Sequence, residues 1–292
     1  MSSAQPAAAA TNHDAFAFVQ SLARELSGSK LDIPSFPDVA VRVRRVLQDE
    51  NVSAEQVTRV VGAEPALAAR LLQLANSAAL NVSGRRVTDL RAAVTRIGFN
   101  VIRSAAISFA MSQLRKAEEL KGLHTPLAAL WHRSAQVAAM SHVVARRLTG
   151  VNADSALLAG LLHGIGKLYV MVRAARFPAL FADAAGYNEI VRDWHANIAR
   201  AILENWEMSD EIVAAVHGHE DLEYTHEGPP DLTDVLIVAN LLASQQEFPD
   251  SIELNLQGVA SASLMKLDAE TFRRLIEDCG TEIEALRVAL GD

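Results

Sequence analysis

The sequence is poor in cysteine, and this scarcity limits both its chemistry and its location. Its 292 residues include one cysteine, Cys279, so no intramolecular disulfide can form. A single thiol fits a reducing, cytosolic compartment. No cation close to Cys279 in the sequence favours a reactive thiolate. We therefore interpret this residue as a small buried hydrophobe in a C-terminal helix.

Aromatic residues are also scarce, and strand-like alternation is nearly absent. Aromatic side chains make up 5% of the chain, whereas 50% of its residues are hydrophobic. This hydrophobic content excludes a largely disordered chain. A core built mostly from Leu, Val, Ile and Ala suits helix-on-helix packing. Together with dense helix start and stop signals, the composition predicts an all-α protein.

Positive charge and membrane-spanning runs are lacking as well. The formal net charge is −8, which disfavours general binding to a phosphate backbone. The N-terminal segment Met1–Asn12 has no basic region of the kind that starts a secretory signal. The most apolar run, Ala156–Val172, is interrupted by His163, two glycines and Lys167. We expect this run to be a buried helix, and we expect the protein to be cytoplasmic and to bind no membrane.

Capping residues place the expected helices. Ser53 and Gln56 form a capping-box pattern, Pro65 suits a first helical turn, and Gly98 suits a helix end. Two prolines in Ile33–Pro37 predict a rigid turn. The expected helices cover about 14–26, a segment from Asp38, one after Ser53, one from Pro65, one from Thr88 (as cap) to Gly98, and then 100–116, 125–149, 154–174, 188–207, 209–217, 232–247 and 268–290.

These elements predict two helical lobes. We expect residues 1–30 to be a variable N-terminal segment with one helix, and 31–120 to form an N-terminal bundle of about five short helices. Residues 125–290 would form the second helical lobe with the C-terminal helices. Lys121–His124 has the composition of the linker between them.

Histidines concentrate in the second lobe, where eight of the nine follow residue 120. His163 lies inside the apolar run and needs a polar partner if it is buried. The two glycines beside it indicate close helix packing or a bend, and a bond to a backbone carbonyl would satisfy His163 without any function. If a helix ends at Gly218, His219 can turn inward. The alternative for His219 is a solvated helix end.

Several short motifs, taken in order, resemble the HDOD family, which is related to the His-Asp metal phosphohydrolases and to the cyclic-di-GMP phosphodiesterases of the HD-GYP type. The resemblance covers about residues 31–290. It implies a two-lobed helical HDOD fold with an HD-like second lobe. The segments that carry it are Ile33–Pro37, Glu64–Leu67, Leu74–Ala78, Ala92–Ala93 with Ile97–Gly98, Leu130–Ser134, Leu162–Lys167, Trp206 with Ile212, and Val238–Asn240.

The departures from the catalytic relatives predict a degenerate site. The resemblance implies a ligand histidine where this chain has Arg133, and His-Asp where it has His163-Gly164. It implies a histidine pair at Gly218-His219 and a final aspartate at Asn240. Loss of both carboxylates and gain of a fixed positive charge disfavour a bound divalent ion. Without the ion no hydroxide nucleophile forms at neutral pH.

Our leading interpretation is a non-catalytic regulatory module of bacterial-type signal transduction that binds a signalling protein on another chain or an anionic small ligand. We expect no catalytic residue, no metal and no cofactor. An anion pocket and a set of inherited residues that merely satisfy one another are equally compatible with the sequence. The candidate pocket residues are Arg133, His163, Lys167, His195, His219 and Asn240.

Two alternatives remain open. One is a divergent metal-dependent phosphohydrolase (phosphodiesterase) with ligands recruited from Asp193, His195, His217 and Glu220. The other is a nucleic-acid-binding regulator, for which a local run of arginines is the only support and which the negative net charge disfavours. Those arginines are Arg85, Arg86, Arg91, Arg96 and Arg103.

Overall fold

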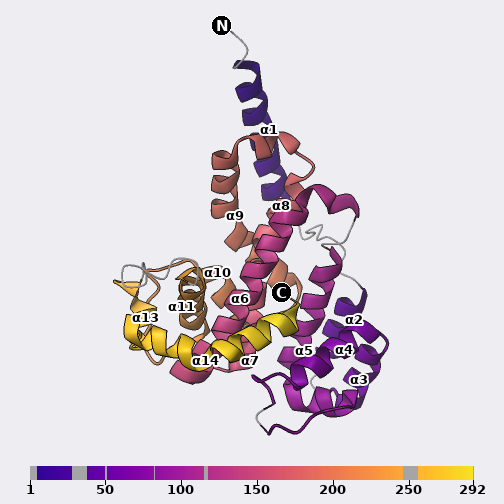
Figure 1. Ribbon diagram of the computed structural model, residues 1–292. Coiled ribbons are helices and arrows are strands. Elements are labelled where there is room, and N and C mark those ends of the chain that lie inside the picture. Colours follow the sequence, from indigo (N-terminus) through magenta and orange to yellow (C-terminus); the bar gives the residue numbers. More distant parts are fainter. Residues whose placement is uncertain are drawn as a thin grey trace.

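The computed structural model is helical throughout the parts of the chain that it describes (Figure 1). It describes residues 5–27, 38–49, 51–81, 83–114, 118–245 and 256–291. The all-α prediction is therefore confirmed. The Ile33–Pro37 turn lies outside the described residues. Positions 246 and 247 of the helix predicted over 232–247 lie outside them as well.

The first part of the chain consists of a long N-terminal helix, three short helices, one kinked helix and a 3-10 helix. Within it, α3 and α4 start as predicted, because Ser53 and Gln56 form the capping box and Pro65 lies in the first turn. Gly98 adopts φ +76° inside α5 and divides it, as expected for a helix stop. The elements are α1 (Gln5–Ser27), α2 (Asp38–Val46), α3 (Ala54–Gly62), α4 (Pro65–Ala75), α5 (Leu90–Leu114) and the 3-10 helix η1 (Glu118–Leu123).

The second part is built around α6 (His124–Leu148), which packs against α7 and α11 and is also contacted by α14. The helices of this second part supply most of the buried core. Figure 1 shows α14 running beside α6 and reaching the helices of the first part, and it contacts α4 and α5 there. The remaining elements are α7 (Ala153–Leu162), α8 (Ile165–Ala174), η2 (Pro178–Ala182), α9 (Ala184–Asn205), α10 (Asp210–Gly218), α11 (Leu232–Gln245), α13 (Ala260–Leu264) and α14 (Ala269–Leu290).

The single helix predicted over 154–174 is wrong, because the chain turns at His163 and Gly164 and forms α7 and α8 instead. The run 153–174 is apolar and long enough to cross a membrane by length and composition, and an 18-residue window within it has a mean hydropathy of 1.5. However, 78% of this window is buried inside the protein. This burial is typical of core helices, and the break at His163 interrupts the run.

Two further helix starts differ from the prediction for local reasons. The carboxylate of Asp89, not Thr88, accepts the capping hydrogen bond, from the backbone N–H of Ala92 at 2.8 Å. The α9 helix begins four residues early because Asp183 caps it through Gly186. The short helices η2 and α13 were not predicted. Cys279 is buried in α14 as expected, with 1% of its surface exposed.

Candidate functional site

Three buried histidines meet where α7, α9 and α10 come together. His163 ends α7, His195 lies in α9 and His219 follows α10. Their exposed fractions are 2%, 1% and 1%. The ring of His219 lies edge-on to the other two rings, with centroids 5.3 Å from His163 and 5.7 Å from His195. We call these three residues the histidine cluster.

Each ring of the histidine cluster is oriented by a backbone carbonyl. Nδ1 of His163 lies 2.6 Å from the Gly160 oxygen, and Nδ1 of His219 lies 2.7 Å from the Val216 oxygen. Nδ1 of His195 lies 2.9 Å from the Val191 oxygen. A carbonyl oxygen can only accept, so each Nδ1 carries a proton and Nε2 is the ring nitrogen that faces away from the backbone contact. The Nε2 atoms of His195 and His219 are buried and have no hydrogen-bond partner.

One carboxylate and one ammonium border the cluster. The Glu220 oxygens lie 3.4 Å from Nε2 of His195 and 3.5 Å from Nε2 of His219. The Lys167 ammonium donates to Glu220 Oε1 at 2.6 Å. His195, His219 and Lys167 together hold the pKa of the Glu220 carboxyl well below its ordinary value, so this group is an anion at neutral pH.

His163 is neutral in this environment. Burial is the largest cause and holds its pKa well below the ordinary value of a histidine. The neighbouring His219, Lys167 and Arg133 lower that pKa further, while the hydrogen bond to Gly160 opposes the shift. The sequence-based alternative of a carbonyl-bonded core histidine therefore describes the Nδ1 side of His163 correctly.

Glycines allow the helices to approach closely enough to form the cluster. A Cβ on Gly166 would lie 1.9 Å from the carbonyl oxygen of His195. A Cβ on Gly160 would lie 2.6 Å from Cα of Ala138. No side chain fits at such distances from a backbone, so α8 meets α9, and α7 meets α6, only through glycine. The close-packing interpretation of glycines in this run is confirmed at these two positions.

Arg133 and Asn240 form a separate group between α6 and α11. The Nη2 atom of Arg133 donates to the Asn240 carbonyl oxygen at 2.6 Å, to Asn240 Oδ1 at 2.9 Å and to Ser244 Oγ at 2.7 Å. We call this group the Arg133 clamp. These two predicted pocket residues thus bind each other, as the alternative of mutually satisfied residues requires.

Replacing Arg133 by Met should lower the free energy of unfolding by about 1–3 kcal/mol, because Asn240 Oδ1 loses its donor while the apolar stem is kept. Chemical denaturation of the wild type and the variant measures this. Arg59→Met is the matched control, since the Arg59 side chain is 77% exposed and forms one exposed ion pair with Glu55. The control should change stability by less than about 0.5 kcal/mol, and an equal loss in both variants would contradict the clamp.

The recruited-ligand set proposed from the sequence is only half assembled. His195 and Glu220 lie together beside His219. Asp193 is exposed and pairs with Arg192, and Nε2 of His217 contacts Asn197 Oδ1 at 3.3 Å. Glu220 directly follows His219 but belongs to no motif, and the sequence offered it only as a nearby candidate ligand.

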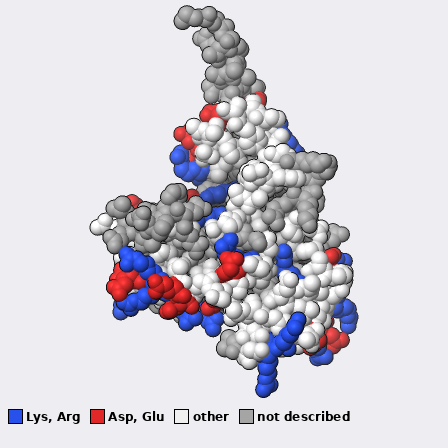
Figure 2. Space-filling model, in the orientation of Figure 1, with Lys and Arg blue, Asp and Glu red and all other residues white. Residues whose placement is uncertain are grey.

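The arginine run predicted as a basic patch is partly structural. Arg96 donates to the backbone oxygen of Arg85 and to Asn81 Oδ1, and Arg103 donates to the backbone oxygen of Leu47. Burial lowers the pKa of Arg103. On the face shown in Figure 2, basic and acidic side chains are interleaved over α14. Neither feature favours a nucleic-acid interface.

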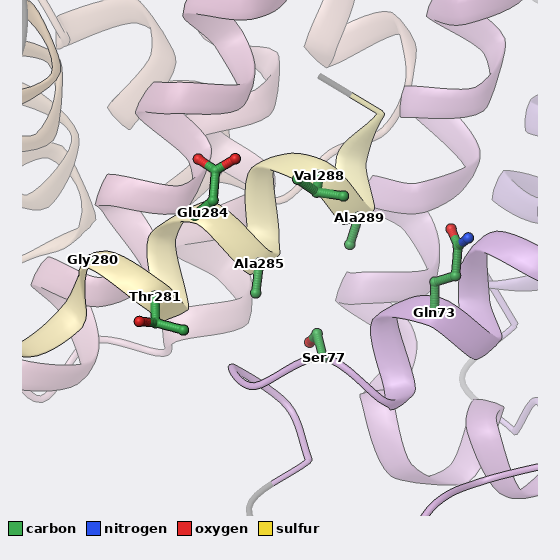
Figure 3. Close-up of a pocket in the computed structure, with 8 residues that line it drawn as sticks. All are labelled: Gln73, Ser77, Gly280, Thr281, Glu284, Ala285, Val288 and Ala289. Carbon is green, nitrogen blue, oxygen red and sulfur yellow. The ribbon is translucent and has the colours of Figure 1, made fainter.

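Another depression lies between α4 and α14 (Figure 3). Gln73 and Ser77 border it on one side, and Thr281, Ala285 and Val288 border it on the α14 side. None of its lining residues belongs to the histidine cluster or to the Arg133 clamp. This depression therefore adds no group to the candidate site.

Comparison with protein-family models decides the family. The HDOD domain model matches residues 33–222. This chain belongs to the HDOD family. A curated relative of the HDOD chain is an uncharacterized protein of Treponema pallidum, 22% identical over 227 residues, which are 72% of this chain and 42% of that protein. The chain therefore spans less than half the length of that relative.

Solved structures agree with the HDOD fold. One from Shewanella amazonensis, described as a candidate metal-dependent phosphohydrolase, is 27% identical, with a TM-score of 0.72 over 95% of this chain and 99% of that one. An HDOD domain protein of unknown function from Geobacter sulfurreducens is 20% identical, with a TM-score of 0.64 over 93% and 97% of the two chains. The predicted fold and family are thereby confirmed.

Proposed function

We propose that this HDOD protein is a non-catalytic regulatory module of signal transduction that acts by binding a signalling protein on another chain, in the cytoplasm. The Arg133 clamp carries the proposal. It places a fixed cation at the positions where the catalytic relatives are expected to carry a histidine and an aspartate. Metal-dependent hydrolysis needs anionic or imidazole ligands at these positions, and a guanidinium there repels a divalent ion.

Access to the histidine cluster also disfavours hydrolysis. The three rings are almost fully buried, and the Lys167–Glu220 ion pair lies at their exposed side, with side chains 30% and 39% exposed. A phosphodiester would have to separate this pair and then approach the rings. The same contacts make a protein partner a better candidate than an anionic ligand, since Arg133 and Lys167 are already bonded to groups of the chain itself.

An assay of hydrolysis tests the absence of catalysis. Purified protein would be incubated with bis(p-nitrophenyl) phosphate and with cyclic dinucleotides, each in the presence of Zn²⁺, Mn²⁺, Fe²⁺ or Ni²⁺. We expect no turnover above the protein-free control. Turnover that His219→Gln abolishes would overturn the proposal, because it would place the reaction at the histidine cluster.

The binding half of the proposal needs its own experiment. Affinity capture from the native host with mass spectrometry would identify candidates, and each would be purified and titrated against the HDOD protein. We expect one signalling protein to bind with a defined stoichiometry. If no captured protein binds after purification, a role through a protein partner is rejected.

A second function, a divergent metal-dependent phosphohydrolase, is favoured by one observation. His195 and Glu220, which the sequence offered as recruited ligands, do lie beside His219. Three ligands with one open position can activate water. The hydrolysis assay separates this function from the first one.

A further inference from the structure

Nitrogen and oxygen atoms that can bind a cation face one another where His195, His219 and Glu220 meet. Nδ1 of each ring lies beside a backbone carbonyl oxygen, so each ring directs its Nε2 atom toward a carboxylate oxygen of Glu220. A proton or a cation between a ring nitrogen and a carboxylate oxygen would stabilise such an arrangement. The Lys167 ammonium reaches Glu220 Oε1, but the two buried Nε2 atoms have no hydrogen-bond partner.

The separations decide between a proton and a metal ion. Charge-assisted N–H···O bonds are about 2.7–2.9 Å long. The contacts of His195 Nε2 with Glu220 Oε2 at 3.4 Å and of His219 Nε2 with Glu220 Oε1 at 3.5 Å exceed that length. Ligand atoms about 2.0–2.1 Å from a tetrahedral ion lie about 3.3–3.4 Å apart. One atom from each of the three residues also falls within 4.8 Å of the other two. The spacing thus fits a shared cation better than two hydrogen bonds.

We propose that His195, His219 and Glu220 bind one divalent transition-metal ion of the Zn²⁺ class. Two imidazoles and one carboxylate suit a borderline ion, whereas Mg²⁺ and Ca²⁺ prefer sets of oxygen ligands. The carbonyl bonds at Nδ1 are the outer contacts that usually orient metal-binding histidines. His163 packs against His219 but is not one of the three grouped ligands.

This inference revises our expectation, drawn from motif positions alone, that the chain holds no metal. It is independent of the proposed function, because an ion held by these three residues can be structural rather than catalytic. Lys167 would keep its bond to Glu220 Oε1 and leave Oε2 directed toward His195. The ion would therefore link α9 to the end of α10.

A second group of potential ligands has another explanation. His226, Asp231 and Asp234 also bring their ligand atoms together. Asp231 Oδ1 accepts from the Asp234 N–H at 3.0 Å, and Asp234 Oδ2 accepts from the Asp231 N–H at 2.9 Å. This reciprocal pair caps the start of α11, so its oxygens are already used.

The test measures metal binding directly on the full chain. Protein stripped with a chelator would be titrated with Zn²⁺ and with Co²⁺, followed by elemental analysis after dialysis, the visible absorption of Co²⁺ and the Tm. We expect one ion per chain, a tetrahedral-type Co²⁺ spectrum and a higher Tm. Glu220→Gln should bind at least about tenfold more weakly, because it removes the only anionic ligand.

Three further variants complete the test. His195→Gln should also lose metal binding. If this substitution of a buried residue prevents folding, Glu220→Gln still tests the site, because the Glu220 side chain is partly exposed. His217→Gln is the matched control, since His217 lies two residues from His219 yet contacts Asn197; it should bind as the wild type does. The proposal is overturned if the wild type binds no stoichiometric ion, if Glu220→Gln binds equally well, or if Asp231→Asn is the variant that loses the ion. If the wild type binds the ion but hydrolyses no substrate, both the metal site and the proposed function stand. If the metal-loaded wild type hydrolyses a phosphodiester, the proposed function is rejected and the metal site stands.

Discussion

Replacing Gly166 by Ala is expected to destabilise the protein by about 3 kcal/mol or more and to lower Tm by roughly 5–10 °C. The added Cβ would lie 1.9 Å from the His195 carbonyl oxygen, 2.8 Å from its carbonyl carbon and 3.1 Å from the Ala199 nitrogen. All three atoms belong to the backbone of α9, which cannot yield as a flexible side chain does. The two helices α8 and α9 must therefore move apart, and His195 must move with α9.

Gly280→Ala is the matched control for this loss. Gly280 lies inside α14, and no atom lies within 4 Å of a Cβ added there. Alanine has the higher helix propensity, so this variant should be unchanged or more stable by up to about 1 kcal/mol. Thermal unfolding of both variants gives the comparison. Similar Tm values for Gly166→Ala and the wild type would show that α8 and α9 do not meet through Gly166.

Local signals allowed much of the fold to be predicted. The capping box at Ser53, Pro65 in a first turn and Gly98 at a kink act within a few residues, so the sequence alone reveals them. The break at His163 was missed because the apolar residues continue across it without a proline. There the turn is stabilised by contacts with other helices, and the periodicity of apolar residues along the sequence does not reveal such contacts.

The sequence predicted which residues belong to the candidate site, but not which of them lie together. His163, His195 and His219 were all named from the sequence, yet their rings meet only because α7, α9 and α10 come together. Lys167 was expected to line an anion pocket and instead pairs with Glu220. Sequence spacing describes neighbours within one helix, so a group drawn from several helices needs the tertiary structure.

The glycines on either side of His163 link the packing of the helices to the orientation of the histidine rings. Each glycine sets a close helix approach that also places a ring: Gly166 brings the His195 segment against α8, and the Gly160 oxygen accepts from His163 Nδ1. The packing and the orientation of the rings therefore depend on the same atoms.

Gly160→Ala should test that dependence with a loss of about 3 kcal/mol in the free energy of unfolding. The new Cβ would lie 2.6 Å from Cα and 2.9 Å from the backbone nitrogen of Ala138, and 2.9 Å from Ser141 Oγ. Because α6 and α7 form the most extensive helix contact of the described structure, they cannot separate cheaply. Denaturant unfolding monitored by circular dichroism measures the change.

The control for Gly160→Ala is Gly150→Ala, at a position just after α6 where an added Cβ meets no atom within 4 Å. Its stability should stay within about 0.5 kcal/mol of the wild type. Any Gly160→Ala protein that still folds should also show a shifted imidazole resonance for His163, since the carbonyl that orients the ring has moved. A stability loss without that shift would mean that packing and ring orientation are separate, and that the orientation of His163 does not depend on the α6–α7 contact.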